Sequence, residues 1–307
     1  MKLEGLARHT SGAAATSCHF VMFRYDAQRG LHKDSCDSWV VQREGTTLHC
    51  LLGGTSWWTG LWRSPTGKVF MTEASGRLLM NPDPEPRKAP WQELPLRGVV
   101  LSGVWGLDDQ HVYIWGQPHD HAAGDTVMFF HDGDKLTPMP APVGKVWSIH
   151  GVRPDLVYAV GDGGLIARWD GRAWHTVPAP TQAVLSAVCV VSEDEMYAVG
   201  AGKRLLSGSL AGWRDVLEAP SQMFGVAKFQ GNVWVGASAS GLMKLDGSRL
   251  VQSQKMQAER VEARQEILVS SPGGIAGSSD GHKFGGVSIS TLLALVADEP
   301  PRWVRGG

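Results

Sequence analysis

The sequence predicts an all-β fold of repeated four-stranded units, and three observations lead to it. Two sequence markers recur along the chain in a common phase. The 307 residues also include 38 glycines, 17 prolines and 13 tryptophans. Many short strands that are separated by tight turns and packed by aromatic side chains have such a composition. We therefore expect a single domain, residues 1–307, that folds as a β-propeller.

The clearest copy of the unit is residues 157–174, VYAVGDGGLIARWDGRAW. Two short apolar runs flank the glycine-rich residues 161–164, which supply the positive φ angles of a tight hairpin. Asp170-Gly171 marks a second turn, and the large apolar Trp174 follows it. The segment predicts strand, turn, strand, turn and strand, and a turn that leads into a strand offers no helix N-terminus for a phosphate.

The first marker is a turn, most often Asp-Gly, followed by an aromatic residue or leucine that we call the anchor. Successive anchors are separated, by subtraction of their numbers, by 43, 45, 38, 39, 37 and 34 residues. This period is typical of propeller blades. Seven anchors predict seven blades, with six as the alternative because the first copy is the most degenerate. The anchors are Leu48, Trp91, Leu136, Trp174, Trp213, Leu250 and Phe284.

The second marker is an aromatic or aliphatic residue inside a β-branched run upstream of the anchor. In the three central copies it precedes its anchor by 16 positions, since 174 − 158, 213 − 197 and 250 − 234 all equal 16. Two markers that keep one phase predict a regular repeat whose apolar faces stack on neighbouring units. These residues are Phe70, Tyr113, Tyr158, Tyr197, Trp234 and Leu268.

The two ends of the chain depart from the regular unit. The first unit, residues 18–52, contains a longer hairpin. After the last anchor, residues 286–304 read as further strands, which we expect to pair with the N-terminal blade and close the ring, removing exposed sheet edges. Residues 252–267 have a helix-favouring composition, but we interpret them as a blade connection with a short helical turn.

Residues 98–250 resemble a family of bacterial β-propeller repeats. The segments VWGLDDQHVYIWG, VYAVGDGGLIARWDGRAW and MYAVGAGKRLLSG are similar to those of photosystem-assembly-factor propellers and, distantly, of sialidase-like Asp-box propellers. The resemblance implies the fold and no particular activity, because this fold serves lectins, hydrolases, assembly factors and protein-binding hubs. The nearest Asp-box match, residues 278–284, lacks the glycine spacing, the threonine and the tryptophan.

The charge and composition of the chain limit the classes of binding partner and the cellular compartment that we expect. With 29 basic and 30 acidic residues the formal net charge is −1, which argues against nucleic acid and anionic membranes as partners. The sequence shows no secretory h-region and no apolar run of transmembrane length, so we expect a cytoplasmic protein, with secretion that needs no N-terminal signal as the alternative. The four cysteines have no metal or disulfide spacing and are expected as free thiols.

The densest group of metal-type ligands is His119, His121 and Asp125, in an insertion of the third unit. A His-x-His pair with a carboxylate is able to hold a divalent ion such as Zn²⁺. The alternative is that these are exposed loop side chains. We predict no other cofactor and no catalytic residue, because nucleophile-elbow, zinc-protease and P-loop motifs are missing from the sequence.

Candidate contact residues lie in a tryptophan cluster and in the inserted loops. The cluster TSWWTGLW is either an exposed hot spot or part of the buried core. The inserted loops are residues 27–37, 81–89 and 117–124. The partner-binding candidates are Trp57, Trp58, Trp62, Arg29, His32, Arg87 and His119.

These features predict a non-enzymatic propeller that binds a protein partner. An immunity or inhibitor protein that neutralises its partner, or an accessory protein that scaffolds it, would use rigid blades to position variable loops. The first alternative is a carbohydrate-binding propeller, which needs exposed tryptophans with polar neighbours. The second alternative is a hydrolase that uses the axial channel, which needs convergent carboxylates or a metal.

Overall fold

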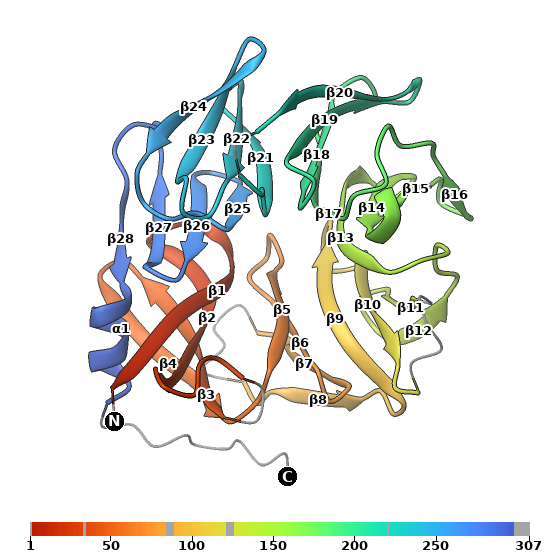
Figure 1. The fold of residues 1–307 in the computed structure, drawn as a ribbon. Helices are drawn as coiled ribbons and strands as arrows, with labels where there is room; N and C mark the ends of the chain where they lie inside the picture. The colour runs from red at the N-terminus through yellow and green to blue at the C-terminus, as the bar shows by residue number, and fades with distance from the viewer. Residues whose placement is uncertain (1, 33–34, 84–88, 121–125, 220, 298–307) are drawn as a thin grey trace.

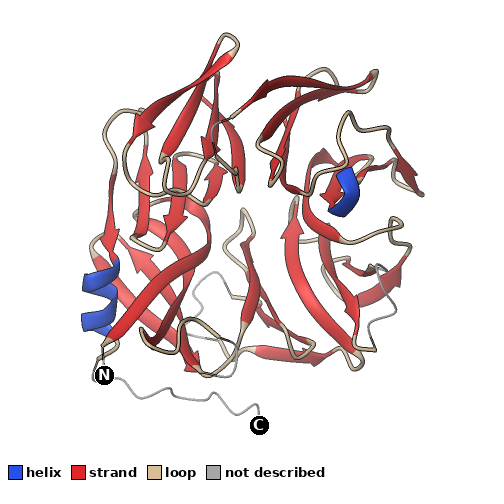
Figure 2. Cartoon of the chain, viewed as in Figure 1, coloured by secondary structure: helices blue, strands red, loops and turns tan. Residues whose placement is uncertain are grey.

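The computed structural model describes residues 2–32, 35–83, 89–120, 126–219 and 221–297. Seven four-stranded antiparallel sheets are arranged as blades around a central axis (Figure 1). Strands dominate, and the helical segments of the described residues are η1 (Asp162–Gly164) and α1 (Ile289–Leu295) (Figure 2). The predicted seven-bladed propeller is therefore confirmed.

Each blade is formed by four consecutive strands. Blade one contains β1 (Leu3–Ala14), β2 (Ser17–Asp26), β3 (Cys36–Glu44) and β4 (Thr47–Gly54). Blade two contains β5 (Trp58–Arg63), β6 (Val69–Glu73), β7 (Arg77–Asn81) and β8 (Gln92–Pro95). Blade three contains β9 (Val99–Gly106), β10 (Val112–Pro118), β11 (Val127–His131) and β12 (Leu136–Met139). Blade four contains β13 (Val146–Arg153), β14 (Leu156–Gly161), β15 (Ile166–Trp169) and β16 (Trp174–Thr176).

The remaining blades follow the same order. Blade five contains β17 (Leu185–Val190), β18 (Met196–Gly200), β19 (Arg204–Ser209) and β20 (Gly212–Glu218). Blade six contains β21 (Gly225–Phe229), β22 (Asn232–Gly236), β23 (Leu242–Asp246) and β24 (Arg249–Gln254). Blade seven contains β25 (Arg260–Ala263), β26 (Ile267–Ser271), β27 (Gly274–Ser278) and β28 (Gly285–Ser288).

The two sequence markers occupy fixed places in this arrangement. The upstream marker falls in the second strand of blades two to seven, where Tyr158 of β14 is 1% exposed. The anchors fall at or beside the start of the fourth strand, as Trp174 does in β16. Gly163 and Gly164 of the predicted hairpin turn have φ angles of 64° and 73°. The sequence repeat therefore corresponds to the four-stranded blade, with each marker in the same strand. Its buried residues fill the space between neighbouring sheets.

The predicted pairing of N- and C-terminal strands is wrong within the described residues. β28 is the edge strand of blade seven, and the chain then turns into α1, whose N-cap Ser288 accepts a hydrogen bond from the Thr291 amide. Leu292 and Val296 are four residues apart, so a helix places both on one face, and both are fully buried against blade one. Residues 298–304 of the predicted pairing segment lie outside the described residues.

Polar contacts join blades seven and one where a shared sheet was expected. The amide of Ala15 donates to Glu266 Oε2 at 2.8 Å, and the amide of Glu266 donates to the Ala13 carbonyl at 3.1 Å. Ser11 Oγ donates to Glu262 Oε1 and accepts from Arg264 Nη2, both at 3.2 Å. We call these contacts the closure seam.

Residues 252–267 form the end of β24, a connection, β25 and a hairpin that leads into β26. The predicted blade connection is confirmed, and the short helical turn expected within it is not formed. In the described part of the chain, no helix has the length and apolar character that crossing a lipid bilayer requires.

Two cysteines behave as predicted for free thiols in the core. Cys18 and Cys189 are buried, and neither is in a disulfide. Burial raises the pKa of Cys18 to about 12 and that of Cys189 to about 11. Both thiols therefore stay protonated at neutral pH and pack as small apolar groups.

Candidate functional site

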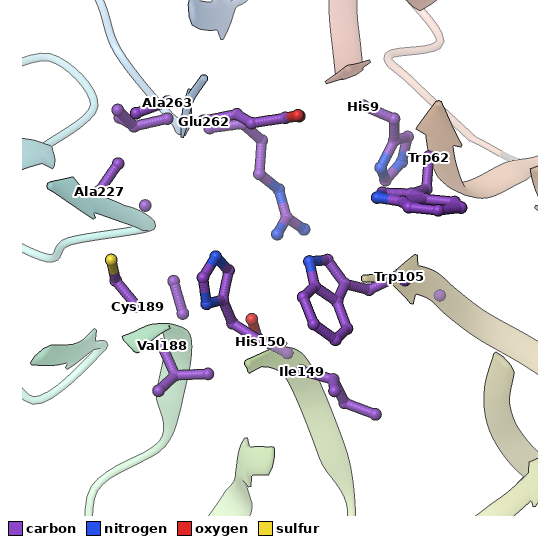
Figure 3. A pocket seen from close by; sticks show the side chains of 18 of the residues that line it. His9, Trp62, Trp105, Ile149, His150, Val188, Cys189, Ala227, Glu262 and Ala263 are labelled. Atoms are coloured by element: carbon purple, nitrogen blue, oxygen red, sulfur yellow. The ribbon is translucent and has the colours of Figure 1, made fainter. Parts of the chain in front are cut away.

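The first strands of all seven blades surround an axial cavity of about 890 Å³ (Figure 3). We call the end at which these strands begin the start mouth, and the end at which they turn into the second strands the hairpin mouth. Because strands alternate in direction within a blade, the connections between second and third strands lie on the face of the start mouth. The cavity has the size of a ligand site, which is typically about 300–1,000 Å³.

The cavity wall is positively charged although the chain as a whole is almost neutral. Its cations outnumber its single carboxylate, Glu262, four to one. The formal net charge of the chain is −1. Low-dielectric walls of one charge sign concentrate oppositely charged ligands in a cleft. The lining cations are Arg63, Lys228, Arg260 and Arg264.

At the hairpin mouth, two cations are paired with carboxylates of the chain. Lys228 Nζ lies 2.5 Å from Glu195 Oε1, and Arg264 Nε lies 2.7 Å from Glu262 Oε1. The hydrogen bond from Lys228 lowers the pKa of Glu195, whereas burial raises the pKa of Glu262. Arg63 Nη1 donates to the carbonyl oxygen of Ser17 at 3.1 Å. The charges at this mouth therefore hold neighbouring strands together.

At the start mouth, His9 of blade one and Arg260 of blade seven line the cavity, and Arg8 precedes His9 in β1. Burial, Arg260 and Arg8 all lower the pKa of His9. Arg260 lines the cavity but is exposed to solvent, and its pKa is lowered by partial desolvation there and by Arg8. Within the described residues, neither arginine has a carboxylate at ion-pairing distance. The start mouth thus gathers basic groups that the surrounding chain leaves unneutralised.

His9 occupies this place through an unusual backbone conformation. Its φ of 52° is rare for a residue with a side chain, and it lies in the register shift between Arg8 and Ser11. The Trp58 backbone next to the ring opposes the effects of burial and of the two arginines and raises the pKa of His9. Figure 3 shows the imidazole among the side chains that line the cavity.

A second histidine on the wall is held in one neutral form. The amide of Val190 donates to His150 Nδ1 at 3.1 Å, which leaves the proton on Nε2. Burial, and next Arg264, lower the pKa of His150 to about 4. Trp105 packs on it with ring centroids 5.2 Å apart and stacks on Tyr113 at 6.0 Å (Figure 3). His150 is therefore an uncharged wall residue at neutral pH.

The rim of the start mouth exposes a tryptophan in a fixed orientation. Trp147 is 40% exposed, and its Nε1 donates to Asp162 Oδ1. Lys145 Nζ lies 4.1 Å from the centre of its ring, a cation–π distance. Val143, four residues before Trp147, is 83% exposed. Tryptophan and arginine are the residues most enriched among interface hot spots.

The tryptophan cluster predicted from the sequence is mostly core. Trp58 and Trp62 are 5% and 4% exposed, so the buried-core alternative is confirmed and the contact prediction is wrong for both. Both lie on inner strand β5, where Trp58 fills the space toward blade one and Trp62 the space toward blade three. Trp57 is half-buried, with its ring 5.2 Å from that of Phe23.

The described contact candidates of the inserted loops lie on one face of the propeller. Arg29 and His32 follow β2, and His119 follows β10, so all three belong to the face of the start mouth and all are exposed. Arg87 lies outside the described residues. The predicted metal site stays a prediction, because His121 and Asp125 also lie outside them. Among the described side chains, no group of three metal-type ligands converges.

A smaller cavity of about 220 Å³ opens between blades six and seven. Trp234 lines it but is 3% exposed, and Asp280 accepts hydrogen bonds from the amides of His282 and Lys283 in its own turn. The aromatic ring that a sugar would stack on is thus covered, so this cavity gives little support to the carbohydrate alternative.

Sequence reasoning missed Arg8, His9 and Arg260. Little in the sequence marks them. The first residue of β25 is an arginine, whereas the first strands of blades five and six begin with Leu185 and Gly225. Only the closed ring brings this arginine next to β1.

Comparison with known proteins shows similarity both in sequence and in fold. No family model matches the chain. Over 96 residues it is 31% identical to immune protein Tsi7 of Pseudomonas aeruginosa, and the match covers 31% of either protein. The chain thus spans about a third of the length of this curated relative.

The structural matches concern the fold. YCF48 bound to D1 peptide has a TM-score of 0.56 at 14% identity, over 74% of this chain and 79% of that one. The WD40 β-propeller domain of Doa1 has a TM-score of 0.69 at 11% identity, over 90% and 93%. Both share the propeller architecture with this chain, which agrees with the predicted resemblance at the level of the fold.

Proposed function

We propose that this chain is a non-enzymatic binding protein that engages a protein partner with the face around the start mouth, in an inhibitory role like that of an immunity protein. The observation that carries the proposal is the start mouth itself, where the exposed Trp147 and the unpaired Arg260 line the same cavity. The partial match to immune protein Tsi7 supports the inhibitory role. YCF48, whose structure contains the D1 peptide, is an example of this fold with a bound peptide.

The architecture suits this role. Stacked blades form a rigid frame, and the variable connections that follow β2 and β10 are presented on the same face as Trp147. A partner that covers this face would bury Trp147 at the centre of the contact and the two connections toward its edge. Central aromatic anchors surrounded by a polar rim are the usual arrangement of energetically important contacts.

The hydrolase alternative has less support in the described residues. Its carboxylate pair would have to face the axial cavity, where Glu262 lines the wall. This carboxylate is already engaged by Arg264 at 2.7 Å and by Ser11 at 3.2 Å. A general acid or nucleophile needs a carboxylate that is available to the substrate.

The test is capture of the partner from a lysate of the source cells, followed by titration of the purified partner. We expect wild type and Leu210→Ala to bind equally, since Leu210 is an equally exposed apolar residue at the β19–β20 turn, on the other face. Trp147→Ala should weaken binding about tenfold or more, because truncation of a hot-spot residue costs about 2 kcal/mol.

A partner that binds Trp147→Ala as tightly as wild type would overturn the placement of the site. Glycan-array binding without any captured protein would overturn the proposed function in favour of the carbohydrate alternative. We also propose that the chain acts in the cytoplasm, and cell fractionation with an antibody to the chain tests this.

A further inference from the structure

The start mouth concentrates positive charge where no described carboxylate forms an ion pair with it. Arg8 and His9 come from β1, and Arg260 is the first residue of β25. Glu259 is the carboxylate whose charge acts on Arg260, yet it forms no ion pair with it within the described residues. Like charges held together in a partly desolvated place are unfavourable unless something binds them.

The backbone adds a second sign of function. His9 is held with φ at 52°, in the left-handed region that residues with a Cβ seldom adopt. The ladder between β1 and β2 is interrupted there, which turns the imidazole into the cavity. Strained residues of this kind cluster at binding and active sites.

The cavity next to these basic groups is large and has aromatic side chains on its wall. Arg260, His9 and Trp147 all line the same space of about 890 Å³. Trp105 lies further along its wall (Figure 3). A lone inorganic ion would use a small part of this space, whereas an extended chain would fill it and contact the aromatic rings.

We propose that the start mouth is a carboxylate-binding site that receives an acidic peptide segment of the partner protein, with Arg8 and Arg260 as its charge partners and Trp147 as its rim contact. The inference rests on the proposed function and specifies the chemistry of the bound segment. Guanidinium groups bind carboxylates through two parallel hydrogen bonds, which gives both strength and orientation. A phosphate would meet the same donors, and the experiment separates the two.

Isothermal titration calorimetry with the full chain tests the inference. The probes are a blocked hexaglutamate peptide, a blocked hexaglutamine peptide and inorganic phosphate. We expect hexaglutamate to bind at low salt, at least tenfold more weakly in 200 mM salt, and hexaglutamine not to bind. Arg260→Gln and Arg8→Gln should each weaken hexaglutamate binding at least tenfold, and Arg260→Lys should restore part of it.

Arg214→Gln is the matched control, since Arg214 is an exposed arginine on the outer strand β20. It should bind hexaglutamate like wild type. Circular dichroism melts of each variant establish that it is folded, and Arg8→Gln provides a second reading if Arg260→Gln does not fold.

Three results would overturn the inference. They are absence of hexaglutamate binding, equal binding by the folded Arg260→Gln and Arg8→Gln variants, and phosphate binding without peptide binding. A captured partner whose affinity is unchanged in Arg260→Gln would refute this inference while the proposed function stands. If Trp147→Ala loses partner binding but still binds hexaglutamate, the arginine site is supported and Trp147 is excluded as a contact of the acidic peptide.

Discussion

The two mouths of the axial cavity contain the same residue types and use them differently. At the hairpin mouth, Lys228 is paired with Glu195 and Arg264 with Glu262, and Arg63 donates to the Ser17 carbonyl oxygen. At the start mouth, Arg260 has no such carboxylate among the described residues. Cations that the chain neutralises itself contribute to its fold, whereas cations that it leaves unneutralised are available to a ligand. This difference is the basis for giving the hairpin mouth a role in stability and for the proposal that the start mouth binds the partner.

The largest expected effect comes from breaking the closure seam at the hairpin mouth. Arg264→Met removes the guanidinium from Glu262 and Ser11 but keeps most of the side-chain volume. We expect the free energy of unfolding to fall by about 3 kcal/mol, the lower end for a broken buried pair, because both partners keep about a quarter of their surface exposed, 25% and 28%. Chemical denaturation measures it.

Arg249→Met is the control for this substitution, since the Arg249 side chain is 78% exposed in a wide surface pair with Asp246. It should change stability by less than about 1 kcal/mol. Equal losses in the two variants would show that the seam does not close the ring.

The second-largest expected effect is a dependence of the free energy of unfolding on pH. His19, in β2, is 1% exposed, and neither ring nitrogen has a hydrogen-bond partner among the described residues. Burial, and next Arg63 of the hairpin mouth, lower its pKa from 6.5 to about 3. The unfolded chain therefore binds this proton more readily, so stability is complete above pH 6.5 and falls as the pH drops toward 3.

The expected slope is about 1.4 kcal/mol per pH unit below 6.5, for this one group. His19→Leu should remove that part of the slope, while His282→Asn, at an exposed turn residue, should keep it. Denaturation curves at pH 7, 6 and 5 provide the measurement. An unchanged slope in His19→Leu would mean that other groups cause the acid sensitivity.

The smallest effect is expected at the start mouth itself. Arg260→Gln removes a cation that lies beside Arg8 and His9 and has no carboxylate partner in the described chain. Its free energy of unfolding should equal that of wild type or exceed it by up to about 0.5 kcal/mol, in contrast to Arg264→Met. A loss above about 1 kcal/mol would give Arg260 a structural role and remove the difference between the mouths.

Ring closure shows where local patterns stop being informative. Residues 286–304 contain β-branched and apolar residues, a composition that favours strands. Ser288 instead caps α1, and the four-residue spacing of Leu292 and Val296 buries both on one helix face. The two periods coexist in a short apolar run, and contact with blade one selects the helix.

The face that we propose for partner binding is predictable in part from the sequence. The inserted connections that carry Arg29, His32 and His119 stand out by their departure from the repeat, and they belong to the face of the start mouth. The basic group does not stand out in the same way. Arg260 is more than 250 positions from Arg8 and His9 in the chain, since 260 − 9 equals 251, and no local pattern joins it to them.

The sequence alone determined the repeat, because strand alternation and turn residues act over a few neighbouring positions and mark every blade in the same way. The places of Tyr158 and Trp174 within their blade therefore follow from their neighbours along the chain. Only the tertiary structure decided that Trp58 and Trp62 are buried and that β25 meets β1 beside His9. These facts depend on the ring closing, and closure is a property of all seven blades packed together.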